Sequence, residues 1–251
     1  MSPISQLRRR KTDNMNKNTA APAEGVNEYT PVRKSGVYRV LKRTADIAAS
    51  LFALIILALP LLFVALAVII EDGAPVFYTQ ERVGKNRRKF RIYKFRSMRR
   101  DADKIHEKLR QEYGSSDVSF KLKDSEDPRI TKVGRFIRRT NIDELPQLIN
   151  ILKGDMSLVG PRPLPTYEYD EEQSRYGDRY AARYDVPQGL TCYWQISSRS
   201  EVDFDERMQM DADYARDAKI SVDTKLLFKT AVYAVTGKAG YDGERKKVVN
   251  K

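Results

Sequence analysis

The chain has few of the side chains that enzymes commonly use for acid–base chemistry and metal binding. Its 251 residues include one histidine, His106, and one cysteine, Cys192. A single histidine in a charged stretch, which we expect to be an exposed helix, excludes a histidine triad and a multi-histidine metal site. A single cysteine excludes an internal disulfide and fits a reducing compartment. Nucleophilic or acid–base work therefore falls to carboxylates, hydroxyls, lysine or the thiol.

Signatures of the common nucleotide-binding folds and of repeat architectures are also absent. The sequence contains no GxGxxG fingerprint, no P-loop and no internal repeat. Any nucleotide that the protein recognises is therefore bound by something other than a Rossmann or Walker motif.

Positive charge is concentrated in one part of the chain. The formal net charge is +12, and residues 82–100 contain ten lysines or arginines and no acidic residue. Such a stretch suits nucleic acid, anionic lipid head groups or a phosphorylated substrate. Charge alone leaves the three partners open.

Residues 47–70 form an uncharged run of 24 residues. At about 1.5 Å per residue, a straight helix of this length crosses a hydrocarbon core of about 30 Å. The run begins too far into the chain, is too long for a signal peptide and lacks a small-residue cleavage site. We therefore expect a membrane helix.

Both flanks of this helix are basic. The residues before it are Arg33, Lys34, Arg39, Lys42 and Arg43, and the basic stretch 82–100 follows it. Positive flanks mark the cytoplasmic side, and Pro60 near the middle predicts a kink. We expect a re-entrant helix–break–helix that enters and leaves one leaflet; the alternative is a single span with a proline kink.

The remaining pattern predicts an α/β fold that is mainly helical and contains a small β-hairpin or sheet. We expect a disordered basic tail (1–36), a re-entrant helix (37–72) and a catalytic domain (73–251). Strands at 76–79 and 90–95 form the hairpin, 114–127 is a loop, and 187–199 is a loop leading to a short strand. Helices are expected at 102–113, 130–139, within 165–185, at 204–217 and at 224–235. The last is amphipathic and suits either the core or a membrane surface.

Residues 140–163 are the strongest candidate for a site. Asp143 and Glu144 begin an expected helix with Pro146 in its first turn, and Gly154 ends it. Acidic residues at a helix start also have a purely structural use, stabilising the macrodipole by about 0.3–1 kcal/mol. Arg162 follows, between two prolines that stiffen the backbone. The combination suits phosphate chemistry with room for a divalent metal.

Several motifs occur in the order and spacing of one known family. They are Lys42–Asp46, Pro60, residues 75–84, residues 93–98, residues 143–147, residues 154–163, Trp194-Gln195 and Arg199. With these motifs the chain resembles the bacterial sugar transferase family, the monotopic phosphoglycosyl transferases, from about Tyr38 to Tyr241.

The resemblance implies transfer of a sugar 1-phosphate from a UDP-sugar to polyprenyl phosphate, releasing UMP, as a first membrane step in glycoconjugate or exopolysaccharide synthesis. It implies Asp143 as nucleophile and Glu144 as a ligand of Mg²⁺, the expected cofactor. The expected location is the cytoplasmic face of the bacterial membrane, with both chain ends cytoplasmic. The expected partners are the donor, the acceptor and membrane lipid but no nucleic acid, with a homodimer possible.

Other candidate residues surround the acidic pair. Lys94, Arg96 and Arg162 are candidates for neutralising the diphosphate, with a solvated hairpin face or lipid contact as the alternative for the first two. Gln195 and Arg199 are candidates for a nucleotide or sugar loop. We expect head-group or bilayer contacts from Lys42, Arg43, Asp46 and Pro60. The competing function is a membrane-anchored module that binds anionic lipid or nucleic acid without catalysis.

Overall fold

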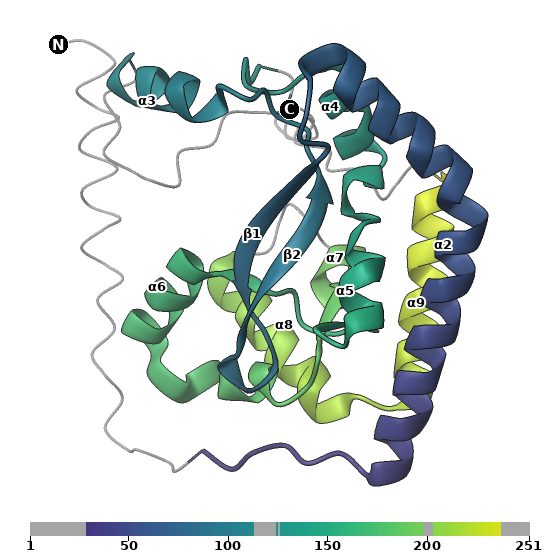
Figure 1. The fold of residues 1–251 in the computed structure, drawn as a ribbon. Helices are drawn as coiled ribbons and strands as arrows, with labels where there is room; N and C mark the ends of the chain where they lie inside the picture. Colours follow the sequence, from purple (N-terminus) through teal and green to yellow (C-terminus); the bar gives the residue numbers. More distant parts are fainter. Residues whose placement is uncertain (1–28, 113–123, 125, 198–202, 237–251) are drawn as a thin grey trace, which may run out of the picture. The chain divides into compact units, whose positions relative to one another are not determined.

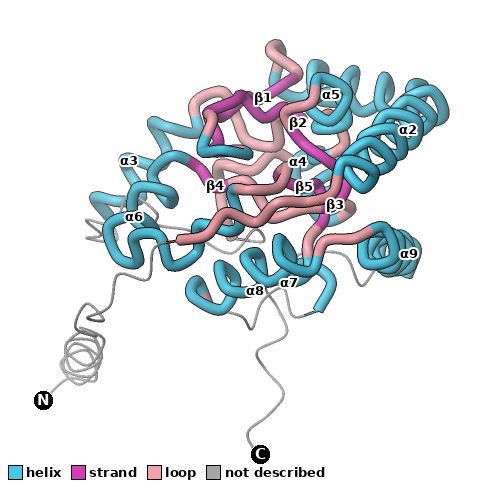
Figure 2. The backbone as a smooth tube through the Cα atoms, turned by 90° about the horizontal axis from the view of Figure 1, so that it is seen from below, coloured by secondary structure: helices cyan, strands magenta, loops and turns pink. Residues whose placement is uncertain are grey.

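The computed structural model describes residues 29–112, 124, 126–197 and 203–236. Helices dominate this part of the chain, and two small sheets lie among them, which confirms the expected mainly helical α/β class. Figure 2 shows the short strands among loops and helices, with α2 (Gly36–Asp72) and α9 (Ile220–Thr236) along one side. The expected tail falls almost entirely outside the described residues.

The apolar run forms most of α2. Ser35 caps its first turn by accepting a hydrogen bond from the Tyr38 amide. Pro60 lies inside the helix without interrupting it, so the structure has one continuous helix where we expected two halves. Proline removes one backbone hydrogen bond and crowds the preceding turn, which accounts for the change of direction visible in Figure 1. The helix is long and apolar enough to cross a membrane, and 6% of its most apolar stretch is buried in the protein.

The first part of α2 fastens the helix to the protein through polar side chains. Lys42 pairs with Asp223 of α9 at 2.9 Å, and Asp46 accepts a hydrogen bond from the Leu158 amide. Arg43 donates to the carbonyls of Ile151 and Leu152. We expected these three residues at the lipid head groups, and the structure instead turns them inward. Helical spacing explains the difference, because positions 42 and 46 share the face that packs on the body.

The predicted hairpin is present and longer than expected. Strand β1 (Phe77–Val83) pairs antiparallel with β2 (Lys89–Phe95), through the short 3₁₀ turn η1 (Lys85–Arg87). Strand β4 (Leu164–Pro165) pairs with the other edge of β1. The hairpin thereby joins the basic stretch to the chain that follows Arg162.

A second sheet pairs two strands that are distant in sequence. Strands β3 (Met156–Val159) and β5 (Gln188–Thr191) run parallel. Gly160 and Gly189 let these backbones meet closely, because a Cβ on Gly160 would lie 2.2 Å from the Pro187 carbonyl oxygen. We expected a strand late in residues 187–199, whereas β5 comes first and the short helix α7 (Tyr193–Ser197) follows.

The remaining helices largely match expectation. They are α3 (Ala102–Glu112), α4 (Lys132–Arg139), α5 (Gln147–Lys153), α6 (Thr166–Tyr176), the 3₁₀ segment η3 (Gly177–Tyr184), α8 (Phe204–Asp217) and α9. Gly154 ends α5 with a positive φ of 92°, as predicted. The helix expected to begin at Asp143 starts later, because residues 142–144 form a separate 3₁₀ turn, η2 (Ile142–Glu144).

A small apolar core ties α5 to its neighbours. Ile92 of β2 packs with Leu148 and Ile151 of α5 and with Met156 of β3, and Leu54 of α2 joins from outside. Each fully buried aliphatic side chain of this kind contributes about 1.5–3 kcal/mol of transfer free energy. The core therefore fixes β2, α5 and α2 relative to one another, directly beside Glu144.

Candidate active site

The Glu144 carboxylate is held by two cations from different parts of the chain. Lys94 of β2 donates to its Oε1 at 2.8 Å, and Arg162 donates to the same oxygen at 2.7 Å and to Oε2 at 3.3 Å. The exposed fractions of the Lys94, Glu144 and Arg162 side chains are 17%, 16% and 26%. Three of the predicted site residues thus meet in one half-buried cluster.

Local backbone geometry presents the acidic pair. Asn141 adopts a left-handed conformation with φ of 56° between α4 and η2, which interrupts the helical backbone just before Asp143. Asparagine tolerates this conformation better than most residues. The single 3₁₀ turn then places Asp143 and Glu144 outside the regular hydrogen bonding of α5, where both side chains reach the half-buried surface.

Asn150 sets the position of Lys94. Its side chain is fully buried, accepts a hydrogen bond from the Tyr93 amide at 3.0 Å and donates to the Arg91 carbonyl at 2.8 Å. These bonds use backbone groups on the outer edge of β2 and attach that edge to α5. Lys94, the next residue, is thereby directed at Glu144.

The backbone around Arg162 is held by three elements. The carbonyls of Pro161, Arg162 and Pro163 accept hydrogen bonds from the Gly189 amide, Arg183 and Arg82, at 2.8, 2.7 and 3.0 Å. The flanking prolines fix φ and contribute no N–H of their own. The turn is consequently rigid on both sides of the arginine.

The two adjacent carboxylates titrate in opposite directions. Burial and the neighbouring Glu144 charge raise the pKa of Asp143 to about 6, while Lys94 and other cations oppose the shift. Burial also acts on Glu144, but Arg162 and Lys94 hold its pKa well below the usual range. Environments that push two carboxyl pKa values apart assign them different roles. Glu144 stays ionised, and Asp143 exchanges its proton near neutral pH.

Of the two adjacent acidic residues, Asp143 is the better placed to act as a nucleophile. Among the described residues, no hydrogen bond or ion pair engages its carboxylate, in contrast to Glu144. An ionised aspartate near two cations is a suitable nucleophile for an electron-poor phosphorus, since the cations neutralise charge developing on the phosphoryl oxygens.

The donor set also fits Mg²⁺. No cluster of three histidine, cysteine, aspartate or glutamate side chains lies among the residues that the structure describes. Mg²⁺ usually needs only one or two carboxylates and completes its shell with substrate phosphates and water. Oε2 of Glu144, which has only the 3.3 Å contact, and the Asp143 carboxylate are the oxygens that meet this requirement.

Other predicted site residues lie elsewhere. Arg96 donates to the carbonyls of Asp72 and Gly73 and pairs with Asp72, so its guanidinium closes the C-terminal end of α2 and is not among the contacts of Glu144. Cations stabilise helix C-termini, which explains this placement. Gln195 lies in α7 and accepts a hydrogen bond from the buried Cys192 thiol. Arg199 falls outside the described residues.

Much of the basic stretch 82–100 is neutralised within the protein. Ion pairs join Arg87 to Asp178, Lys89 to Glu81, Lys94 to Glu144, Arg96 to Asp72 and Arg99 to Asp101. This pairing weakens the expectation that the stretch acts as a free positive patch for nucleic acid or lipid.

Sequence reasoning missed several residues around the pair. Arg138, near the end of α4, pairs with Asp124 at 3.1 Å and lowers the pKa of Asp143, so its charge acts on the site. Its position five residues before Asp143 was an available signal. Arg82 was masked by its basic neighbours, and nothing local distinguished Asn150 or Arg183.

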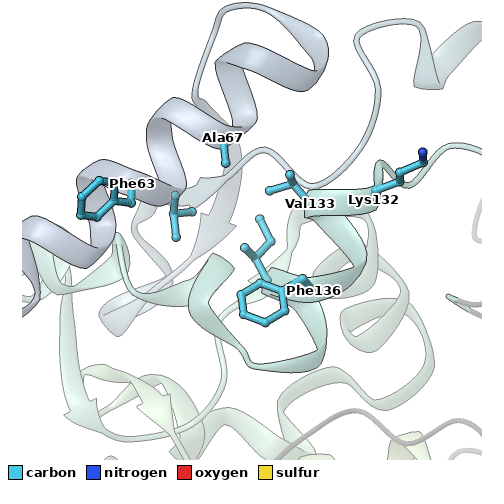
Figure 3. A pocket seen from close by; sticks show the side chains of 7 residues that line it. Phe63, Ala67, Lys132, Val133 and Phe136 are labelled. Carbon is cyan, nitrogen blue, oxygen red and sulfur yellow. The ribbon is translucent and has the colours of Figure 1, made fainter.

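An apolar hollow lies between α2 and α4, the helix that leads to Asp143 (Figure 3). Its volume is about 430 Å³, and it is lined by Phe63, Val64, Ala67, Lys132, Val133, Phe136 and Ile137. Phe63 and Phe136 are 62% and 51% exposed. All but one of the lining side chains are apolar, so the hollow suits an aliphatic chain.

Comparison with known proteins identifies the family. The profile of the bacterial sugar transferases matches residues 37–237, which include all of α2 but its first residue and the whole Glu144 cluster. The chain belongs to the bacterial sugar transferase family. This confirms the resemblance drawn from the motifs.

Three named proteins illustrate the similarity of this bacterial sugar transferase to its relatives. Galactosyl transferase CpsE of Streptococcus agalactiae is 40% identical over 228 residues, covering 90% of this chain and 49% of that protein. Undecaprenyl-phosphate galactose phosphotransferase of Salmonella typhimurium is 44% identical over 200 residues, 77% of this chain and 40% of that protein. UDP-glucose:undecaprenyl-phosphate glucose-1-phosphate transferase of Escherichia coli is 36% identical over 213 residues, 82% of this chain and 43% of that protein. The chain thus spans less than half the length of each.

The opposed titrations give a measurable prediction. In protein labelled with ¹³C at aspartate carboxyls, one signal, absent in Asp143→Asn, should titrate with a pKa of about 6. Glu144→Gln removes a negative neighbour and should lower this pKa, whereas Lys94→Met removes a cation and should raise it, each by roughly one unit. Titration of Asp143 at about 4, as for an exposed aspartate, would refute the assignment.

Proposed function

We propose that the protein transfers a sugar 1-phosphate from a UDP-sugar to polyprenyl phosphate, giving polyprenyl-diphosphate-sugar and UMP. The observation that carries the proposal is the Asp143 carboxylate, which makes no hydrogen bond or ion pair with a described residue, beside Glu144, whose carboxylate holds Lys94 and Arg162. The names of the relatives, which include an undecaprenyl phosphate acceptor and in one case a UDP-glucose donor, support the same reaction.

The transfer proceeds in two displacements at one phosphorus. A carboxylate oxygen of Asp143 attacks the β-phosphorus of the donor, and the bond from that phosphorus to the bridging oxygen breaks, releasing UMP. An oxygen of the lipid phosphate then attacks the phosphosugar–aspartate, and the aspartate leaves as carboxylate. Lys94 and Arg162 face the phosphoryl oxygens, where positive charge lowers the barrier most.

Mg²⁺ is the cofactor in this proposal. Oε2 of Glu144 and the Asp143 carboxylate would hold it together with oxygens of the donor diphosphate. When bound, the ion neutralises the diphosphate and favours departure of UMP.

Placement at the membrane brings the site to its acceptor. We propose that α2 bends within one leaflet and that both chain ends lie on the cytoplasmic side, because basic residues flank the apolar run at both ends. Exposed apolar side chains of α9, including Phe228 at 71% and Val232 at 42%, lie on the helix that packs beside α2 and suit the same surface. This gives the outer face of α9 a membrane role, while its Leu226 packs in the core.

The hollow between α2 and α4 is where we place the first isoprene units of the acceptor. Its α2 wall belongs to the membrane helix, and α4 continues through Arg138 to the turn that carries Asp143. An apolar chain lying here would leave its phosphate at the basic end of α4, next to the nucleophile.

Loss of the nucleophile should abolish the reaction. Asp143→Asn should lower UMP release from UDP-sugar, polyprenyl phosphate and Mg²⁺ by about 10³-fold or more, because an amide cannot attack. Glu144→Gln should cost about tenfold to hundredfold, since the two cations lose their anchor. Asp170→Asn, the same change at an exposed position on α6, is the matched control and should be unaffected. No UMP from wild-type protein with any of a panel of UDP-sugars would refute the function.

Filling the hollow should impair the acceptor step alone. Ala67→Trp should raise KM for polyprenyl phosphate by about tenfold and leave the burst of UMP with donor alone unchanged. The control is Ile70→Trp, which adds the same side chain to a position on α2 that is 84% exposed and does not line the hollow. Equal effects of the two substitutions, or a reduced burst in Ala67→Trp only, would contradict acceptor binding there.

A further inference from the structure

The carbonyl of Arg162 is bound by a fully buried ion pair that contributes no atom to the Glu144 cluster. Arg183 Nη2 donates to the Arg162 carbonyl at 2.7 Å and to Asp211 Oδ2 at 2.9 Å. The side chains of Arg183 and Asp211 are 0% and 1% exposed. They belong to η3 and α8, so two elements outside the site converge on its arginine.

A buried pair of this kind is poorly explained by stability alone. Desolvating both charges costs about as much as their attraction returns, and apolar side chains of similar volume often serve a protein equally well. Buried polar groups also lack partners here, since Arg183 Nε and Asp211 Oδ1 have no hydrogen bond among the described residues. The pair is therefore better explained by the direction of the bond that Arg183 makes than by the free energy of folding.

Further contacts make that direction rigid. Arg183 Nη1 donates to the Tyr184 hydroxyl at 2.8 Å, and that hydroxyl donates to Glu172 Oε2 at 3.0 Å. The guanidinium is therefore fixed at both nitrogens of its fork, one on Tyr184 and one on Asp211 and the Arg162 carbonyl. Burial raises the pKa of Asp211 to about 6, while Arg183 and the backbone of Arg162 oppose the shift.

We propose that Arg183 and Asp211 are positioning residues that fix the peptide of Arg162, so that its guanidinium stays on Glu144 beside Asp143. Arg162 is followed by a proline, which restricts its backbone to extended conformations. Its carbonyl is the backbone group whose direction the ion pair controls. Through this bond, α8 and η3 determine where the phosphate-facing cation lies. The kinetic part of the proposal rests on the proposed transferase function; the geometric part does not.

A double-mutant cycle tests the proposal. Arg183→Met with Asp211→Leu replaces the pair by apolar side chains and removes the bond to Arg162. This double replacement should lower kcat for UMP release by about tenfold to hundredfold in the wild-type background. In an Arg162→Met background it should cost less than about a further twofold, because the cation being positioned is already gone. Thermal unfolding of each variant shows that it is folded.

The matched control is another buried arginine–aspartate pair. The side chains of Arg129 and Asp127 are 10% and 3% exposed, and Arg129 Nη2 lies 2.6 Å from Asp127 Oδ2. This pair makes no contact with Arg162 among the described residues. Arg129→Met with Asp127→Leu should change kcat by the same factor in both backgrounds. If the Arg183 and Asp211 replacement also lowers kcat by the same factor in both backgrounds, the proposal is wrong and the pair has only a structural role.

A second readout is independent of turnover. In protein labelled with ¹⁵N at arginine, the Arg162 guanidinium, which is held on Glu144, should rotate more freely after the Arg183 and Asp211 replacement and be unchanged by the Arg129 and Asp127 replacement. Unchanged rotation after the Arg183 and Asp211 replacement would overturn the proposal even if the wild-type protein released no UMP, an outcome that would refute only the proposed function. If the double replacement does not fold, Arg183→Lys keeps the charge near Asp211 but is too short and unforked to hold both partners. It should then show the same dependence on Arg162.

Discussion

The Glu144 carboxylate, shared by Lys94 and Arg162, is the interaction on which the site depends. Two cations facing one half-buried space repel each other, and the negative charge of the carboxylate between them offsets this repulsion. Burial and the same charge raise the pKa of the adjacent Asp143, so the group that anchors the cations also tunes the residue that we propose as the nucleophile. One carboxylate therefore gathers two positive charges, while its neighbour Asp143 makes no hydrogen bond or ion pair in the described part of the chain. With both acids ionised, the four side chains are formally neutral before substrate arrives.

The surrounding fold can be understood as support for that cluster. Asn150 attaches α5 to the edge of β2 and so directs Lys94, while hydrogen bonds from β5, η3 and β1 hold the turn that carries Arg162. Helix α2 adds a polar inner face that binds α5, β3 and α9, and an apolar outer face that the protein leaves exposed. The apolar helix and the site thus share one core.

The sequence predicted these features unevenly. Features set by local pattern, such as the apolar helix, the hairpin, the Gly154 end of α5 and the acidic pair, were predictable because spacing and turn chemistry determine them. Lys42 and Arg43 were assigned to lipid because charge beside an apolar run usually faces head groups; their inward position depends on the rotation of α2, which is a tertiary property. The same holds for Arg96, and for Arg183, whose partner lies 28 residues away in α8. Long-range pairing of charges leaves no local signal.

The central claim is that Asp143 is the nucleophile and that Glu144 holds Lys94 and Arg162 in place. Mass spectrometry of protein quenched after incubation with UDP-sugar and Mg²⁺, without acceptor, tests it directly. The account predicts a mass increase equal to one sugar phosphate, mapped by peptide fragmentation to Asp143 and absent from Asp143→Asn. An adduct on Glu144, or stoichiometric UMP release with no adduct on the protein, would contradict it.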